Sequence, residues 1–352
     1  MAEAAQQPAD TATTQPPETP VVRLEGLTTC LELDEGRLVA VDNVSLTINR
    51  HRTLGVIGES GCGKSIMARS ILQILPPMGS IIGGKVWLHE DGNAPVNLAS
   101  FPARGKQMRS VRGGKISMIF QEPMTSLSPV HSIGDQVSEI LLLHVTRDHR
   151  EAWQQAEEML AKARISNPSQ RMHEYPHQLS GGLRQRVMIA MALACDPLLL
   201  IADEPTTALD VTVQAQILSL MKDLQSQLGM AILFITHDLG VIARMADAVA
   251  VMYLGQVVEY APIRVLFKNP LHPYTSGLLA AVPKLHRSAE RPRLAAIEGT
   301  VPVPIDLPKT CRFLKRCPLA KQGVCDQGIP DLVEVESGHF VRCVLRQPGG
   351  GA

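Results

Sequence analysis

The chain has 352 residues, and its 34 basic side chains balance its 34 acidic ones. A formal net charge of zero argues against a protein that binds nucleic acid through a basic surface. Apolar residues make up 45% of the chain but aromatic residues only 3%, so we expect a core of mainly aliphatic side chains. No apolar run approaches the roughly 18 residues that a membrane-spanning helix needs.

Residues 1–20 contain no Lys or Arg and no apolar stretch. This composition predicts a disordered tail rather than a signal peptide. We therefore expect a cytoplasmic chain, in which thiols stay reduced. The seven cysteines then indicate free thiols or metal ligands instead of disulfides.

The first predicted elements are strands. Residues 21–33 and 38–48 alternate apolar and polar side chains, which predicts an antiparallel region. A short apolar strand over 53–58 ends in glycine, and helical spacing over 65–75 stops at two prolines. Another short strand is expected over 115–120.

Strands and helices then alternate. Helical spacing runs from residue 132 to about 164, and the apolar strands 197–203 and 230–236 each adjoin a helical stretch. This alternation predicts a largely parallel sheet that is covered on both faces. Prolines become frequent farther on, so we expect a domain boundary near 260–285.

The stretch GESGCGKS has the spacing G-x-x-x-x-G-K-S between a predicted strand and a predicted helix. Its glycines let backbone N–H groups point at phosphate oxygens, and the helix adds its N-terminal dipole. Lys64 would hold the β- and γ-phosphates, and the Ser65 hydroxyl would bind Mg²⁺. A glycine-rich turn with an incidental lysine is the alternative. The predicted nucleotide-binding residues here are Gly58, Glu59, Ser60, Gly61, Cys62, Gly63, Lys64, Ser65 and Ile66.

The stretch LLLIADEP ends a predicted buried strand with two acidic residues, at the edge where α/β sheets bind ligands. Asp203 would contact Mg²⁺ directly or through its water, and Glu204 would act as general base on the attacking water. A strand-end turn with solvated acids is the alternative, which the phosphate-binding loop disfavours.

The stretch LSGGLRQR, residues 179–186, resembles the signature of ABC-transporter ATPases. Further motifs occur in the order of that family: IFQEP with Gln121 of the Q-loop, TTALD with Asp210 of the D-loop, and ITHD with His237 of the switch loop. The resemblance covers about residues 21–345.

Ser180, Gly181 and Gly182 would open a helix whose exposed N–H groups form an anion site. A lone S-G-G would otherwise indicate a glycine cap between two helices. The resemblance implies a head-to-tail dimer in which the signature of one subunit caps the γ-phosphate held by the other. ATP would then stabilise the closed dimer, and hydrolysis would release it.

The resemblance also implies roles for two residues that in isolation would be taken as structural or surface side chains. His237 would contact the γ-phosphate and orient the water. Gln121 would reach Mg²⁺ and the water, and couple the site to a membrane partner through the helical segment that follows.

Two positions depart from the family. Leu183 replaces the usual Gln or Met, but its side chain is expected to point away from the phosphates. Residues 28–50 contain no aromatic side chain on which adenine could stack, and Leu38 or Val39 lies nearest to that place.

The stretches NPLHPYTSGLLAAVPKL and RLAAIEGTVPVP resemble the oligopeptide/dipeptide branch of ABC import ATPases. A C-x5-C-x7-C-x17-C spacing follows, made by Cys311, Cys317, Cys325 and Cys343. Four thiolates can hold Zn²⁺ or an iron–sulfur cluster, and unmetallated thiols are the third alternative. The wide gaps do not favour zinc, and the resemblance implies a [4Fe–4S] cluster, which would hold the proline-rich chain together.

The resemblance implies an α/β P-loop ABC ATPase. It would have an antiparallel β subdomain, a mostly parallel core sheet, a helical subdomain and a small C-terminal Cys-rich metal-binding extension. We expect a disordered tail over 1–20, the ATPase domain over 21–265 with its helical subdomain at about 122–180, and the extension over 266–352.

The implied function is ATP binding and hydrolysis, with Mg²⁺ and a [4Fe–4S] cluster as cofactors, to drive import of di- and oligopeptides. The chain would dock on two permease subunits at the cytoplasmic face of the membrane and pair with a second, related ATPase subunit. An extracytoplasmic peptide-binding protein would be an indirect partner. Nickel, glutathione and antimicrobial peptides are alternative cargoes.

Two other classes of protein are alternatives to a transport ATPase. A soluble ABC ATPase of DNA repair or translation is disfavoured by the peptide-branch tail. A purely regulatory nucleotide-binding protein is disfavoured by the intact Glu204 and His237.

Overall fold

A computed structural model describes residues 19–121, 126–207, 209–281, 297–305 and 307–347. The predicted tail lies outside the described residues except for its last two positions. In the described part of the chain, no helix is long and apolar enough to cross a membrane.

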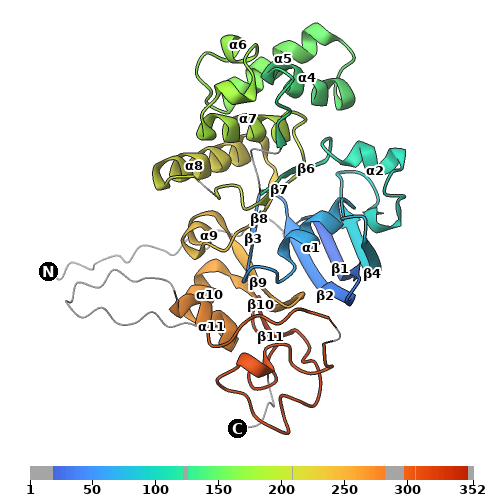
Figure 1. Cartoon of the computed structure of the whole chain (residues 1–352), viewed down its shortest axis with the longest axis vertical. Coiled ribbons are helices and arrows are strands. Elements are labelled where there is room, and N and C mark those ends of the chain that lie inside the picture. The colour runs from blue at the N-terminus through green and yellow to red at the C-terminus, as the bar shows by residue number, and fades with distance from the viewer. Residues whose placement is uncertain (1–18, 122–125, 208, 282–296, 306, 348–352) are drawn as a thin grey trace, which may run out of the picture.

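The N-terminal strands form the predicted antiparallel sheet, on the right of Figure 1. Alternating side chains meet across it: Leu24 pairs with Leu46 on one neighbour and with Val86 on the other, and all three are buried. This alternation is what turns one face of the sheet toward the core. In the order β2-β1-β4-β5, the strands are β1 (Pro20–Leu33), β2 (Gly36–Asn49), β4 (Gly79–Leu88) and β5 (Val96–Asn97).

A second sheet forms the centre of the molecule, and its five consecutive strands β9, β3, β8, β7 and β6 are parallel as predicted. Every residue of β3, β7 and β8 is buried, as expected for strands covered on both faces. Within the described residues the order is β11-β12-β10-β9-β3-β8-β7-β6. Its strands are β3 (Thr53–Ile57), β6 (Ile116–Ile119), β7 (Leu199–Asp203), β8 (Ala231–Ile235), β9 (Ala248–Tyr253), β10 (Gln256–Pro262), β11 (Val333–Glu336) and β12 (His339–Val341).

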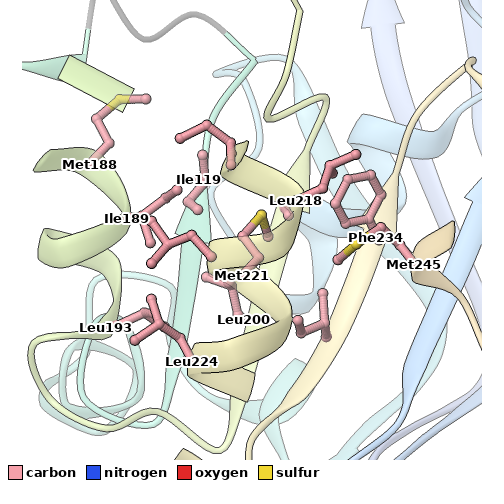
Figure 2. Close-up of a cluster of buried hydrophobic side chains, with 14 of the residues drawn as sticks. Ile119, Met188, Ile189, Leu193, Leu200, Leu218, Met221, Leu224, Phe234 and Met245 are labelled. Atoms are coloured by element: carbon pink, nitrogen blue, oxygen red, sulfur yellow. The ribbon is translucent and has the colours of Figure 1, made fainter. Parts of the chain in front are cut away.

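Successive residues of these strands point into two different cores. Leu200 and Phe234 contribute to the core on the side of α7 and α8, where Figure 2 shows them among methionine and leucine side chains. Ile201 and Leu233, one position away, pack on the side of α1 and the antiparallel sheet. The two-residue period of a strand thus joins the sheet to both layers.

Helices flank the central sheet, and α4, α5 and α6 form a group at the top of Figure 1. Ser132 caps α4 and Asp148 caps α5, each by accepting hydrogen bonds from N–H groups of the first turn. The helices are α1 (Lys64–Ile71), α2 (Lys106–Val111), α4 (Ile133–His144), α5 (His149–Lys162), α6 (Pro168–Arg171), α7 (Gly181–Leu193), α8 (Val211–Leu228), α9 (Leu239–Met245), α10 (Ile263–Lys268) and α11 (Pro273–Ala280), with 3₁₀ turns η1 (Leu98–Ser100), η2 (Pro176–Gln178) and η3 (Leu314–Arg316).

Helix α1 is shorter than the sequence predicts: it ends at Ile71 and does not continue to the two prolines. Gln73 takes a left-handed conformation (φ 50°), which the helix cannot continue through. The guanidinium of Arg112 donates to the carbonyl oxygens of Leu72 at 2.7 Å and Gln73 at 2.9 Å. These bonds satisfy acceptors that the helix end leaves open.

The C-terminal extension adds two strands to the central sheet, which the weak apolar periodicity of the sequence did not predict. Strand β12 pairs with β10, and β11 pairs with β12. Glu259 of β10 is fully buried and accepts hydrogen bonds from His339 Nε2 at 2.8 Å and from the N–H groups of Leu271 and His272 at 2.7 and 2.9 Å. This buried carboxylate joins β10, β12 and the start of α11.

Candidate functional site

The predicted phosphate loop, residues 58–65, connects β3 to α1 and requires its glycines. Gly58 and Gly63 have φ values of 154° and 102°. A Cβ atom would lie 2.2 Å from the Met252 carbonyl oxygen at Gly58, and 2.1 Å from the Ala40 carbonyl oxygen at Gly63. Only glycine lets the loop approach the neighbouring backbone this closely.

Lys64, the first residue of α1, lies inside this loop. Its side chain is buried, and Nζ donates to the carbonyl oxygens of Gly58 at 2.8 Å and Glu59 at 3.0 Å. The ammonium group therefore lies inside the loop whose N–H groups would bind phosphate.

Ser65 and Asp203 meet at the carboxyl ends of β3 and β7. The Ser65 hydroxyl donates to Asp203 Oδ1 at 3.0 Å. Burial raises the pKa of the Asp203 carboxyl, and the hydrogen bond from Ser65 opposes this rise. A hydroxyl and a carboxylate are oxygen donors of the kind that Mg²⁺ prefers, and a cation there would favour the ionised carboxylate. The donor set therefore fits the predicted magnesium site.

Glu204 is the point at which three predicted motifs meet. Its Oε2 accepts from Gln121 Nε2 at 3.2 Å, and its Oε1 lies 3.1 Å from His237 Nδ1. These residues follow β7, β6 and β8, whose carboxyl ends share one edge of the sheet. Thr207, which the sequence analysis missed although it lies in TTALD, also donates to Oε2 at 3.1 Å.

The backbone at Glu204 holds its side chain over this edge. The residue has a left-handed φ of 49°, and its N–H donates to the Ile235 carbonyl oxygen at 2.9 Å. Its side chain is 12% exposed, whereas that of His237 is 65% exposed. Glu204 is thus fixed and partly shielded, while His237 faces outward.

The signature residues begin α7, as predicted. Ser180 caps the helix by accepting from the Leu183 N–H, and Gly181 faces open space. A Cβ atom on Gly182 would lie 3.0 Å from Val213 of α8, so this glycine allows the helices to approach. The hydrogen bond that the Ser180 hydroxyl accepts is thus local to the start of α7.

Gln185 of α7 contacts the segment that follows Glu204, and Asp210 caps α8. Gln185 is buried, and its Nε2 donates to the Pro205 carbonyl oxygen at 2.5 Å, a contact that the sequence analysis missed. The predicted D-loop residue Asp210 caps α8 by accepting from the N–H groups of Thr212 and Val213 at 3.0 and 2.9 Å.

The four C-terminal thiols gather in one region. The Cys311 N–H donates to the Cys325 carbonyl oxygen at 3.4 Å. Burial, with further contributions from the other three thiols, raises the pKa of Cys311 to about 11. Burial and neighbouring thiols also raise the pKa values of Cys317 and Cys343. Among the residues that the structure describes, however, no three His, Cys, Asp or Glu side chains form a ready-made site for one metal ion.

Comparisons with known proteins agree with this geometry. The family model for the ABC transporter matches residues 41–207, and that for the oligopeptide/dipeptide transporter C-terminal region matches residues 258–325. Among solved structures, the dimeric ATP-binding cassette MJ0796 in a post-hydrolysis state, bound to ADP and Pi, aligns with a TM-score of 0.60 and 27% identity. The alignment covers 69% of this chain and 99% of that one.

Relatives resemble nearly the whole chain. A putative peptide import ATP-binding protein of Brucella abortus is 46% identical over 333 residues, which are 93% of this chain and 98% of the relative. The oligopeptide transport ATP-binding protein AppD of Bacillus subtilis is 50% identical over 312 residues, or 88% and 92% of the two chains. This chain therefore belongs to the ABC transporter ATPases, in their oligopeptide/dipeptide branch.

Proposed function

We propose that this chain binds MgATP and hydrolyses it to drive peptide import through separate membrane subunits. The observation that carries the ATPase assignment is the meeting of Gln121 and His237 on the Glu204 carboxylate, next to the Ser65–Asp203 pair. The peptide cargo rests on the match to the oligopeptide/dipeptide transporter C-terminal region and on the similarity to peptide import ATP-binding proteins.

Each residue of the site has a role in hydrolysis. The N–H groups of the phosphate loop and the Lys64 ammonium bind the β- and γ-phosphates. Ser65 and Asp203, with Gln121, would hold Mg²⁺, which neutralises charge on the phosphates. Glu204 accepts a proton from the attacking water, and His237 orients that water and contacts the γ-phosphate.

The signature is proposed to act on a second ATPase subunit. Ser180, Gly181 and Gly182 begin a helix of thirteen residues and are exposed or half-buried, so their N–H groups can receive an anion from outside the chain. A γ-phosphate held by the facing subunit would close the dimer, which hydrolysis would reopen. An ATP-trapped dimer with these residues remote from the opposite triphosphate would contradict this arrangement.

A cavity beside the Q-loop is the proposed docking place for the permease subunits. It has a volume of about 360 Å³ and is lined by apolar side chains of β6, α4 and α7, including Met118, Ile140 and Met188. Phe120, next to Gln121, lines it and is 40% exposed. An apolar segment seated here would contact the residue that precedes the catalytic glutamine.

These partners define the location of the chain. Two permease subunits would hold it at the cytoplasmic face of the membrane, paired with a related ATPase subunit. An extracytoplasmic peptide-binding protein would deliver the cargo to the permeases.

We also propose that the four thiols hold a metal centre, preferably a [4Fe–4S] cluster. Burying several thiolates that repel one another is unfavourable unless positive charge compensates them, and the raised pKa values report that cost. Among the described residues no three such side chains are grouped for a metal ion, so the preference for a cluster over Zn²⁺ rests on the resemblance to the peptide-importer branch.

Uptake of labelled di- and oligopeptides tests the transport function. A strain that lacks this chain should lose uptake, and the wild-type gene should restore it while Lys64→Ala should not. Normal uptake in the deletion strain would refute the peptide cargo. Phosphate release by the purified chain tests the ATPase separately.

A further inference from the structure

Every polar group of Glu59, the second residue of the phosphate loop, is engaged. Its N–H donates to Tyr274 Oη at 2.8 Å, and its carbonyl oxygen accepts from Lys64 Nζ at 3.0 Å. Its carboxylate accepts two parallel hydrogen bonds from the Arg316 guanidinium, Nη1 to Oε2 at 2.7 Å and Nη2 to Oε1 at 3.0 Å. Tyr274 and Arg316 both belong to the C-terminal extension.

The Arg316 side chain is itself held in place. It is only 5% exposed, and Nη1 also lies 3.5 Å from Tyr253 Oη. The guanidinium carbon lies 5.8 Å from the centre of the Tyr253 ring. A planar guanidinium that is buried, stacked and bidentate has little freedom to leave its carboxylate.

Aromatic rings form the support below this ion pair. The ring of Tyr253 lies 4.8 Å from that of Tyr274 and 5.2 Å from that of Phe313, and the latter two rings are 5.4 Å apart. Aromatic residues make up only 3% of the chain, yet three of their rings lie together beside the phosphate loop. These rigid side chains support the position of the Arg316 guanidinium.

The extension also contacts β2, whose Ala40 carbonyl oxygen lies against Gly63 of the loop. Ile305 forms an antiparallel bridge with Leu38, and Arg312 Nη2 pairs with Asp42 Oδ2 at 3.0 Å. Leu38 and Asp42 flank the β2 carbonyl that lies against the last glycine of the phosphate loop. The extension therefore contacts the loop directly at Glu59, and it also stabilises the part of β2 on which the loop packs.

Charge gives the Arg316–Glu59 pair a consequence for nucleotide binding. A triphosphate bound in the loop carries several negative charges, and the Glu59 carboxylate would repel it if unpaired. Arg316 cancels that repulsion and holds the loop backbone in one arrangement before the nucleotide arrives.

We propose that Arg316 is a positioning residue of the nucleotide site, through which the C-terminal extension sets the affinity for ATP. The proposal rests on the phosphate loop being the ATP site, and is independent of the cargo.

The test compares Arg316→Gln with Lys315→Gln in the full-length chain. Lys315 is the adjacent residue, carries the same charge and is exposed, so the second variant controls for net charge. Arg316→Gln should raise the Kd and KM for ATP about tenfold, because a buried charge-assisted contact is lost, with kcat at saturating ATP changed less than about twofold. Lys315→Gln should leave all three values unchanged. Equal ATP affinities of the two variants would overturn the proposal.

A rescue experiment separates this role from mere support of the fold. In Arg316→Gln the Glu59 carboxylate remains unpaired beside the phosphates, so adding Glu59→Gln should return the Kd for ATP to within about threefold of wild type. A double variant as weak as Arg316→Gln, or weaker, would show that charge compensation at Glu59 is not the cause.

Two further variants keep the outcome decisive. If Arg316→Gln does not fold, Arg316→Lys takes its place, because it keeps the charge but loses the bidentate geometry. Arg316→Lys should weaken ATP binding about threefold, and the control Lys315→Arg should not weaken it. Unchanged ATP affinity in Arg316→Lys would overturn the proposal. Lys64→Ala shows whether the loop is the ATP site at all. Unchanged binding in Lys64→Ala would refute the proposed site, whereas lost binding there with normal binding in Arg316→Gln would refute only the inference.

Discussion

Replacing Glu204 by Gln should abolish turnover while leaving the fold and ATP binding intact. The carboxylate contacts Gln121 and Thr207 through Oε2, and His237 through Oε1. A glutamine of the same shape can keep its carbonyl oxygen at the Oε2 position and place its amide nitrogen beside His237 Nδ1. We therefore expect the free energy of unfolding to change by less than about 1 kcal/mol.

The chemistry is affected much more, because an amide cannot take a proton from water. Loss of a general base costs roughly 10²- to 10⁴-fold in rate, or about 3–5 kcal/mol of barrier. Phosphate release at saturating ATP measures kcat, titration with a fluorescent nucleotide measures affinity, and size-exclusion chromatography with ATP detects accumulated closed dimers. The control is Glu32→Gln, an exposed carboxylate that pairs with Arg37 far along the antiparallel hairpin. A kcat within about twofold of wild type would show that Glu204 is not the base.

Three further variants test the phosphate loop, the extension and the thiols. Lys64→Ala should weaken ATP binding about 10- to 100-fold in a nucleotide titration, because an ammonium contact to phosphate is lost; unchanged affinity would refute the loop. Glu259→Ala should lower the free energy of unfolding in urea by about 3–5 kcal/mol, because two buried donors and one half-buried donor lose their acceptor. Glu334→Ala, an exposed residue of the neighbouring β11–β12 hairpin, is the control, and a similar small loss in both would contradict this. Cys343→Ser should remove iron and sulfide from anaerobically purified protein while Cys195→Ser retains both; stoichiometric zinc without iron in the wild type would end the cluster hypothesis.

The features that the sequence predicted well are those with a local cause. Gly58 and Gly63 lie in conformations that their close neighbours impose, and such glycines are visible as a spaced motif. Short apolar runs predicted β3, β7 and β8 because strands buried on both faces need no polar positions. The meeting of His237 with Glu204 needed the family resemblance, since a single histidine after a strand has no local signal of its role.

The contacts between the C-terminal extension and the rest of the chain have no comparable local pattern in the sequence. Arg316 and Glu59 are 257 residues apart in the chain, and Tyr274 and Glu59 are 215 apart. Strands β11 and β12 have four and three residues, too few for a periodic pattern to be recognised. The cysteine spacing drew attention to the thiols, whereas the side chain that reaches the phosphate loop is the arginine between them.

The position of that arginine links the two proposals about the extension. Turn η3, which ends at Arg316, lies between Cys311 and Cys317, so a metal centre that fixes both thiols also fixes the backbone that carries the guanidinium. Cys343 is distant from this turn in sequence, and its replacement by Ser should disturb Arg316 only through the shared centre. Cys343→Ser should therefore raise the Kd for ATP in the same direction as Arg316→Gln, and more weakly, because the aromatic support remains. If Cys343→Ser loses its metal and keeps wild-type ATP affinity, the thiols staple the extension without acting on the nucleotide site.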